Sequence, residues 1–182
     1  MTLPLTMNAD FWLTPARHCP SPHHDERPEG EVSLLVIHSI SLPPARYGGP
    51  YIDQLFLGNL NPDDDPYFAD IHLLRVSAHC LIRRDGELVQ YVPFNKRAWH
   101  AGQSDFNGRA RCNDFAIGIE LEGTDTDRFT AAQYRQLTAV TRLLQARFPA
   151  ITTERIVGHS DIAPGRKTDP GTGFDWDFLK QL

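Results

Sequence analysis

Residues 32–39 read Val-Ser-Leu-Leu-Val-Ile-His-Ser, and this stretch decides the fold class. Its aliphatic residues follow one another instead of alternating with polar ones, which is typical of a strand that is buried on both faces. Such strands belong to α/β domains, in which helices cover the sheet. The stretch places His38 at the carboxyl end of the predicted strand, where open α/β sheets form their binding sites.

Further strands are predicted downstream. The runs at 76–82 and 87–92 flank Arg-Arg-Asp-Gly, and an Asp-Gly turn between β-rich runs predicts an antiparallel hairpin. Residues 115–121 return to strand character, with a glutamate near their end. A last short strand at 155–158 delivers His159 into a loop rich in proline and glycine.

The longest predicted helix begins after Thr130. This threonine and Gln133 resemble a capping box, and apolar residues then recur at helical spacing until Pro149 ends the pattern. We expect the apolar stripe of this helix to cover the sheet. Shorter helical segments are predicted around Tyr51–Leu57 and over 174–182.

Length and composition indicate one domain, 1–182, with residues 1–30 as an irregular, proline-interrupted arm packed on it. The 18 Lys and Arg residues against 23 Asp and Glu give a net charge of −5, which argues against nucleic acid as a partner.

No run approaches the roughly 20 apolar residues of a membrane span. The N-terminus has no basic start or apolar stretch of a signal peptide, so we expect a cytosolic location. A monomer is the default expectation.

Eight histidines raise the question of which could meet at one point. His38 and His159 each follow an apolar strand run, and the Pro- and Gly-rich loop after His159 can return Asp169 towards it. Two imidazoles and one carboxylate are three protein ligands, the number that a catalytic zinc keeps. Spacing alone leaves two alternatives open. The first is a ligand set that includes another histidine, and the second is a serine nucleophile at Ser39 or Ser160, although no G-x-S-x-G motif supports it.

Five motifs in order along the chain carry a resemblance to a known family. They are His-Ser-Ile-Ser-Leu-Pro-Pro at 38–44, Val-Ser-Ala-His-Cys-Leu-Ile-Arg-Arg-Asp-Gly-Glu at 76–87, Ala-Trp-His-Ala-Gly at 98–102, Ile-Gly-Ile-Glu-Leu-Glu-Gly at 117–123 and Gly-His-Ser-Asp-Ile-Ala-Pro-Gly-Arg-Lys-Thr-Asp-Pro-Gly at 158–171. Together they resemble the zinc-dependent N-acetylmuramoyl-L-alanine amidases of the type 2 family. The resemblance implies an α/β fold with a central mixed β-sheet flanked by helices.

The resemblance also implies the residues of the site. Zn²⁺ would be held by His38, His159 and Asp169, the three that position along the chain already favours. Glu120 would act as general base and then general acid, which is worth about 10²–10⁴ in rate. Lys167 would stabilise the oxyanion of the tetrahedral intermediate.

Three further positions are implied as substrate contacts: Arg75, Trp99 and Arg111. A guanidinium recognises a carboxylate through two parallel hydrogen bonds, which suits the anionic stem peptide of a muropeptide. An indole face can pack on sugar or peptide. His79 and His100 lie inside the motifs, and we expect both to be structural or to support the ligands.

The function implied is hydrolysis of the amide bond between anhydro-N-acetylmuramic acid and L-alanine in cytosolic peptidoglycan recycling. One alternative is a lytic amidase that acts on intact peptidoglycan. Another is a peptidoglycan-binding module without catalysis, which is disfavoured because all three ligand positions are filled.

Overall fold

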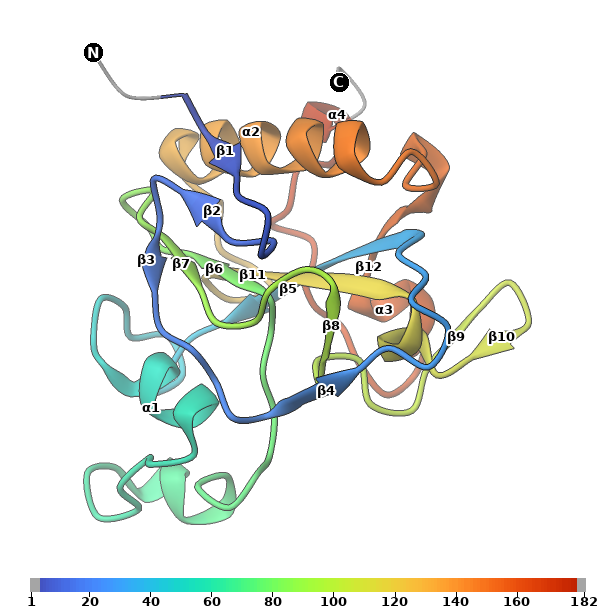
Figure 1. Cartoon of the computed structure of the whole chain (residues 1–182). Coiled ribbons are helices and arrows are strands. Elements are labelled where there is room, and N and C mark those ends of the chain that lie inside the picture. The colour runs from blue at the N-terminus through green and yellow to red at the C-terminus, as the bar shows by residue number, and fades with distance from the viewer. Residues whose placement is uncertain (1–3, 180–182) are drawn as a thin grey trace.

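A mixed six-stranded sheet forms the centre of the computed structural model, which describes residues 4–179 (Figure 1). Its order is β12-β5-β11-β6-β7-β3. All neighbouring pairs are parallel except β6 and β7, which form the predicted antiparallel hairpin. The bounds are β3 Arg17–His18, β5 Leu34–Ile40, β6 Cys80–Ile82, β7 Leu88–Gln90, β11 Ala116–Glu122 and β12 Ile156–Gly158. The predicted mixed sheet is confirmed.

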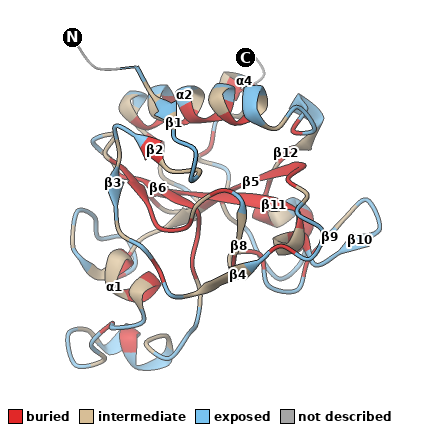
Figure 2. Ribbon diagram, viewed as in Figure 1, coloured by how far each residue is buried: buried red, intermediate tan, exposed pale blue. Residues whose placement is uncertain are grey.

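The two central strands are buried, as Figure 2 shows in red. Every residue of β11 and the first five residues of β5 are buried, which accounts for their unbroken apolar sequence. Side chains alternate between the faces of a strand, so Leu35 and Ile37 point to one side and Val36 and His38 to the other. His38 therefore lies on the face of the sheet opposite to the main hydrophobic core.

Helix α2, Ala131–Arg147, covers one face of the sheet (Figure 1). The predicted capping box forms, since the Gln133 amide donates to the Thr130 hydroxyl at 3.1 Å and the Thr130 amide to the Gln133 side chain at 3.0 Å. Its buried stripe packs with the side chains of β5, β6 and β11 that face it. This layer supplies rigidity and leaves the opposite face free for the site.

The opposite face carries shorter elements. Helix α1, Tyr51–Leu57, ends at Gly58, whose φ of 73° forms a left-handed cap. Together with η1, Pro66–Asp70, it builds a lobe over one side of this face. Helix α3, His159–Ile162, packs on the other side against β5 and β12. The site lies between the lobe and α3.

The structure differs from the sequence-based expectations in several short elements. The arm contains β1 Thr6–Met7, β2 Leu13–Thr14, β3 and β4 His24–Glu26, of which β3 joins the central sheet and β4 pairs with β8 Lys96–Ala98. The loop after β8 contains the hairpin of β9 Asp105–Phe106 and β10 Arg109–Ala110, followed by η2 Cys112–Asp114. Strands of two or three residues are too short to show a periodic pattern, so their partners alone define them.

The C-terminal part shows two further differences. His159 begins α3 directly after β12 instead of entering a loop. A turn η3, Thr153–Arg155, precedes β12, and the last helix α4 spans only Trp176–Leu179. Residues 180–182 of the helix predicted over 174–182 lie outside the described residues.

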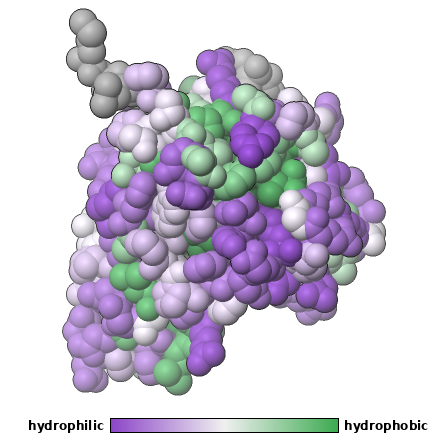
Figure 3. Space-filling model, in the orientation of Figure 1, coloured by the Kyte–Doolittle hydropathy of each residue, from purple (hydrophilic) through white to green (hydrophobic). Residues whose placement is uncertain are grey.

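The outer surface is mostly polar. Figure 3 shows a face that is largely hydrophilic, with hydrophobic residues gathered in separate patches. Within residues 4–179, no helix has the length and apolarity that a bilayer crossing requires.

Candidate functional site

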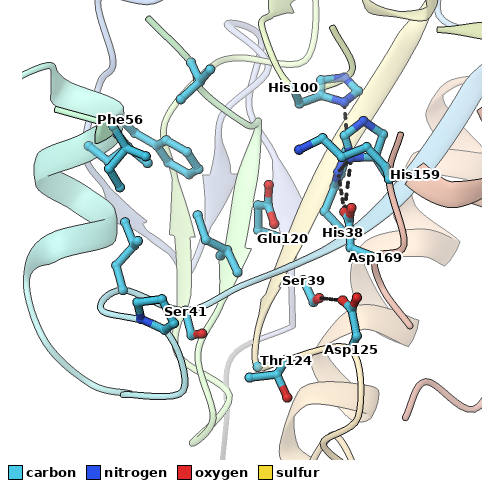
Figure 4. Close-up of a pocket in the computed structure, with 18 of the residues that line it drawn as sticks. His38, Ser39, Ser41, Phe56, His100, Glu120, Thr124, Asp125, His159 and Asp169 are labelled. Carbon is cyan, nitrogen blue, oxygen red and sulfur yellow. Dashed lines mark hydrogen bonds and ion pairs between the residues drawn. The ribbon is translucent and has the colours of Figure 1, made fainter. Parts of the chain in front are cut away.

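Two imidazoles and a carboxylate meet at the edge of the sheet (Figure 4). The Nδ1 atoms of His38 and His159 lie 3.0 Å apart, and each lies 3.1 Å from Oδ2 of Asp169. A tetrahedral zinc with bonds of 2.0–2.1 Å separates its ligand atoms by about 3.3 Å, close to this spacing. The structure therefore brings together the three residues that were expected to hold a metal.

Strand order explains why these residues meet. His38 lies near the carboxyl end of β5, and His159 follows the carboxyl end of β12, which is parallel to β5. Carboxyl ends of parallel strands share one edge of a sheet, where α/β proteins form their sites. The Ser160 amide donates to the carbonyl of Asp169 at 3.0 Å and so returns the following loop to this edge.

The donor atoms fit a cation. Nε2 of His159 lies 3.0 Å from the carbonyl oxygen of Ala101, which can only accept, so Nε2 carries the proton and Nδ1 has a free lone pair. Burial lowers the pKa of His38 to about 4, which keeps this imidazole neutral. Burial opposes ionisation of Asp169, but contacts with His159 and His38 hold its pKa below the usual range. Three electron-pair donors at this distance repel one another unless a proton or a cation lies among them.

Glu120 lies beside the three donors on β11. Its side chain is buried, and Oε2 has no hydrogen-bond partner within residues 4–179. Burial raises the pKa of Glu120 well above its usual value, and the charge of Asp169 raises it further, while Lys167 opposes this shift. A carboxylate whose pKa is raised is a stronger base than an ordinary one and is better suited to accept a proton.

Glu120 and the three donor residues line a cavity of about 640 Å³. One wall is apolar and comes from the lobe, including Phe56, Ile71 and Leu74. The lining also contains polar side chains, among them Lys167 and Asp125. Glu120 points into this space in Figure 4, with Phe56 across from it. The site combines three donor atoms that could hold a cation, a buried carboxyl group and a cavity with polar and apolar lining residues.

Comparison with known proteins assigns this arrangement to a family. The family model for N-acetylmuramoyl-L-alanine amidase matches residues 28–172, which contain every site residue described above. The chain belongs to the N-acetylmuramoyl-L-alanine amidase family. The resemblance based on the five motifs is thereby confirmed.

Individual relatives align with this amidase over most of its length. It is 64% identical over 172 residues to the 1,6-anhydro-N-acetylmuramyl-L-alanine amidase AmpD of Escherichia coli, a match over 94% of this chain and 93% of the relative. The corresponding AmpD of Haemophilus influenzae is 58% identical, over 91% and 90% of the two chains. A crystal structure of a selenomethionine AmpD derivative superposes with a TM-score of 0.94 at 61% identity, over 97% of this chain and 98% of the other.

A more distant solved relative is a ligand complex. The Escherichia coli amidase AmiD, in complex with the substrate anhydro-N-acetylmuramic acid-L-Ala-D-gamma-Glu-L-Lys, matches with a TM-score of 0.61 at 27% identity. The match covers 96% of this amidase and 64% of the AmiD chain. The fold of the present chain is therefore shared with a protein that binds a muropeptide.

The other expected site residues divide into two groups. Lys167 and Trp99 line the cavity of the amidase. Arg75 and Arg111 are exposed and do not belong to its lining, and Arg111 forms an ion pair with Asp114 at 3.3 Å. Their predicted contacts with substrate carboxylates stay a prediction for the surface outside this cavity.

Two residues near the donors make contacts that the sequence analysis did not specify. Nδ1 of His100 lies 2.9 Å from Nε2 of His38, and Asp125 accepts from Ser39 at 3.3 Å. The motif at 98–102 was a signal for His100, but nothing local indicated its contact with His38. Asp125 lies outside the quoted motifs, and no sequence pattern pointed to it.

Proposed function

We propose that this amidase hydrolyses the amide bond between anhydro-N-acetylmuramic acid and L-alanine of muropeptides. The observation that carries the proposal is the meeting of His38, His159, Asp169 and Glu120 in one cavity. Relatives that match over nine-tenths of this chain are named for the same bond. Peptidoglycan recycling is the process in which such anhydro-muropeptides are consumed.

Zn²⁺ is the cofactor that the donor set favours. Two neutral imidazoles and one carboxylate are typical of catalytic zinc sites, and His38, His159 and Asp169 would hold the ion. When bound, zinc lowers the pKa of a water from about 15.7 to about 7 and supplies a nucleophile at neutral pH. Structural zinc sites ordinarily have four protein ligands that include cysteines. The present set has three ligands and no cysteine, which is typical of a catalytic site.

Glu120 moves the proton in this proposal. Its carboxylate takes a proton from the attacking water as the water oxygen bonds to the amide carbon. The same proton then passes to the nitrogen of L-alanine as the carbon–nitrogen bond breaks, so the products are a free carboxylic acid and a free amine. The raised pKa of Glu120 supports this role, because its carboxylate is then a stronger base than an ordinary glutamate.

Lys167 and Trp99 act on the substrate. The ammonium of Lys167 faces the cavity and stabilises the negative charge that develops on the carbonyl oxygen. The indole of Trp99 lines the cavity and offers a packing surface for sugar or peptide. Arg75 and Arg111 would bind stem-peptide carboxylates that extend beyond the cavity. A cytosolic location and a monomeric state stay predictions.

Two substrates distinguish this proposal from its nearest alternative. Purified amidase is loaded with one equivalent of zinc and given either a soluble anhydro-muropeptide or purified sacculi, and release of stem peptide is measured. We expect faster release from the soluble substrate. Faster cleavage of sacculi would instead identify a lytic amidase, and tight muropeptide binding without cleavage would identify a binding module.

A further inference from the structure

One imidazole that we assign to the metal has an unusual partner. Nε2 of His38 lies 2.9 Å from Nδ1 of His100; His38 is buried and His100 is half-buried. The second nitrogen of a metal-binding histidine ordinarily donates to a carboxylate, a backbone carbonyl or water. Here a third imidazole occupies that place. The rings of His38 and His100 meet edge to face at 84° (Figure 4).

The direction of this hydrogen bond follows from metal binding through Nδ1. A neutral His38 that coordinates through Nδ1 carries its proton on Nε2 and must donate it. Nδ1 of His100 then accepts, and His100 carries its own proton on Nε2, which has no hydrogen-bond partner in the described part of the chain.

Tight packing fixes the ring of His100. A Cβ atom at Gly118 would lie 2.4 Å from Cγ of His100, so only glycine at this position of β11 lets the ring approach the strand. Oδ1 of Asn113, in η2, accepts from the amides of His100 at 3.2 Å and Ala101 at 2.9 Å. Side-chain packing and backbone hydrogen bonds thus hold the same dipeptide.

Ala101, which follows His100, contacts the second histidine of the cation site, His159. The carbonyl oxygen of Ala101 accepts from Nε2 of His159 at 3.0 Å and from Nη2 of Arg166 at 2.6 Å. Consecutive residues of one loop therefore contact the outer nitrogens of both histidines of the cation site. A single displacement of this dipeptide would disturb both imidazoles.

We propose that His100 is a positioning residue that holds His38 in the metal-binding tautomer, and that Asn113 positions the His100–Ala101 dipeptide for both histidines. The proposal rests on the metal site of the proposed function. It assigns a role to two residues that contact neither the ion nor the bond that is broken.

Variants of His100 provide the first test. His100→Asn keeps an acceptor oxygen near the place of Nδ1, whereas His100→Leu keeps comparable bulk and removes the acceptor. Zinc affinity is measured by competition with a chromophoric chelator at neutral pH. We expect His100→Leu to weaken zinc binding about 10- to 100-fold and His100→Asn to recover part of this loss. His72→Leu, in the lobe and outside the cavity lining, is the matched control and should bind zinc like the parent.

Variants of Asn113 test the proposed positioning of the His100–Ala101 dipeptide. Asn113→Asp retains an acceptor for the two amides, and Asn113→Leu does not. We expect zinc affinity to fall in Asn113→Leu and to be largely kept in Asn113→Asp. Nitrogen-15 NMR of the metal-free protein should show the proton of His38 on Nε2 in the parent and a larger fraction with the proton on Nδ1 in His100→Leu. A purely structural role of His100 would leave the tautomer of His38 unchanged.

Several outcomes would overturn the proposal. They are a zinc affinity of folded His100→Leu within twofold of the parent, equal losses in His100→Asn and His100→Leu, or a His38 proton found on Nδ1. Thermal unfolding of each metal-free variant shows whether it is folded. If the parent binds no zinc, the proposed function fails first. If the parent binds one zinc and the variants bind it with the same affinity, only the positioning proposal fails.

Discussion

Glu120 lies in register with His38 across the parallel pair of β11 and β5. Residues in register on neighbouring strands point to the same face of a sheet, so the carboxyl group of Glu120 and the imidazole of His38 lie next to each other. Their shared face is opposite to the one that α2 covers. The geometry of the site is therefore set by strand pairing, and surface loops complete it.

Glu120→Gln tests the proton-transfer role. The amide keeps the size of the side chain but cannot take up the proton, so we expect turnover to fall by about 10²–10⁴ while zinc binding is retained. Turnover of the anhydro-muropeptide and zinc content are measured on the same preparation. A variant that retains more than a tenth of the parent rate would exclude Glu120 as the general base.

The same variant tests the cost of burying this carboxyl group. Folding raises the pKa of Glu120, so between its unfolded value near 4.5 and its folded value the native state binds more protons than the unfolded state. The contribution of Glu120 to the free energy of unfolding is therefore fully present at low pH and is lost as the pH rises through that window. We expect metal-free Glu120→Gln to unfold at a higher denaturant concentration than the parent at pH 7, with a smaller difference at pH 4.

Removal of a donor tests the metal site. His159→Ala leaves two of the three donors, and we expect it to lose stoichiometric zinc and all measurable turnover. Elemental analysis after gel filtration measures the metal. His72→Ala is the control, because the ring of His72 contacts backbone carbonyls in the lobe. Full zinc content in His159→Ala would show that the ion binds elsewhere.

Asp125 links two segments that carry donors. It accepts from the hydroxyls of Ser39, next to His38, and Thr168, next to Asp169. We expect Asp125→Ala to loosen both segments and weaken zinc binding roughly tenfold. Asp127→Ala is a matched control, since Asp127 accepts from Tyr47 instead. Equal zinc affinities in the two variants would contradict the linking role.

Gly118→Ala tests the packing of His100. The added methyl would overlap a buried ring, so we expect a loss of about 1–3 kcal/mol in the free energy of unfolding together with weaker zinc binding. Gly49→Ala is the control, because its nearest neighbour would be a Tyr51 side-chain atom at 3.4 Å, ordinary contact distance. Chemical denaturation measures both variants, and an unchanged Gly118→Ala would show that the ring can move.

Local patterns predicted much of the fold. The capping box at Thr130 and Gln133, the Asp-Gly turn and the apolar run ending at His38 each encode a structure within a few neighbouring residues. The sequence could also rank His38, His159 and Asp169 as metal-binding candidates, because strand ends and a Pro- and Gly-rich loop are local features. The family motifs then supported the same three residues and Glu120.

Tertiary structure decided the rest. The register that places Glu120 beside His38, the contact of His100 with His38 and the pairing of the short arm strands depend on residues far apart in the chain. It also placed Arg75 and Arg111 outside the cavity lining. A single sequence records the preference of each segment for helix or strand, but hydrogen bonds between distant segments form only when the whole chain packs, so their partners cannot be read from local spacing.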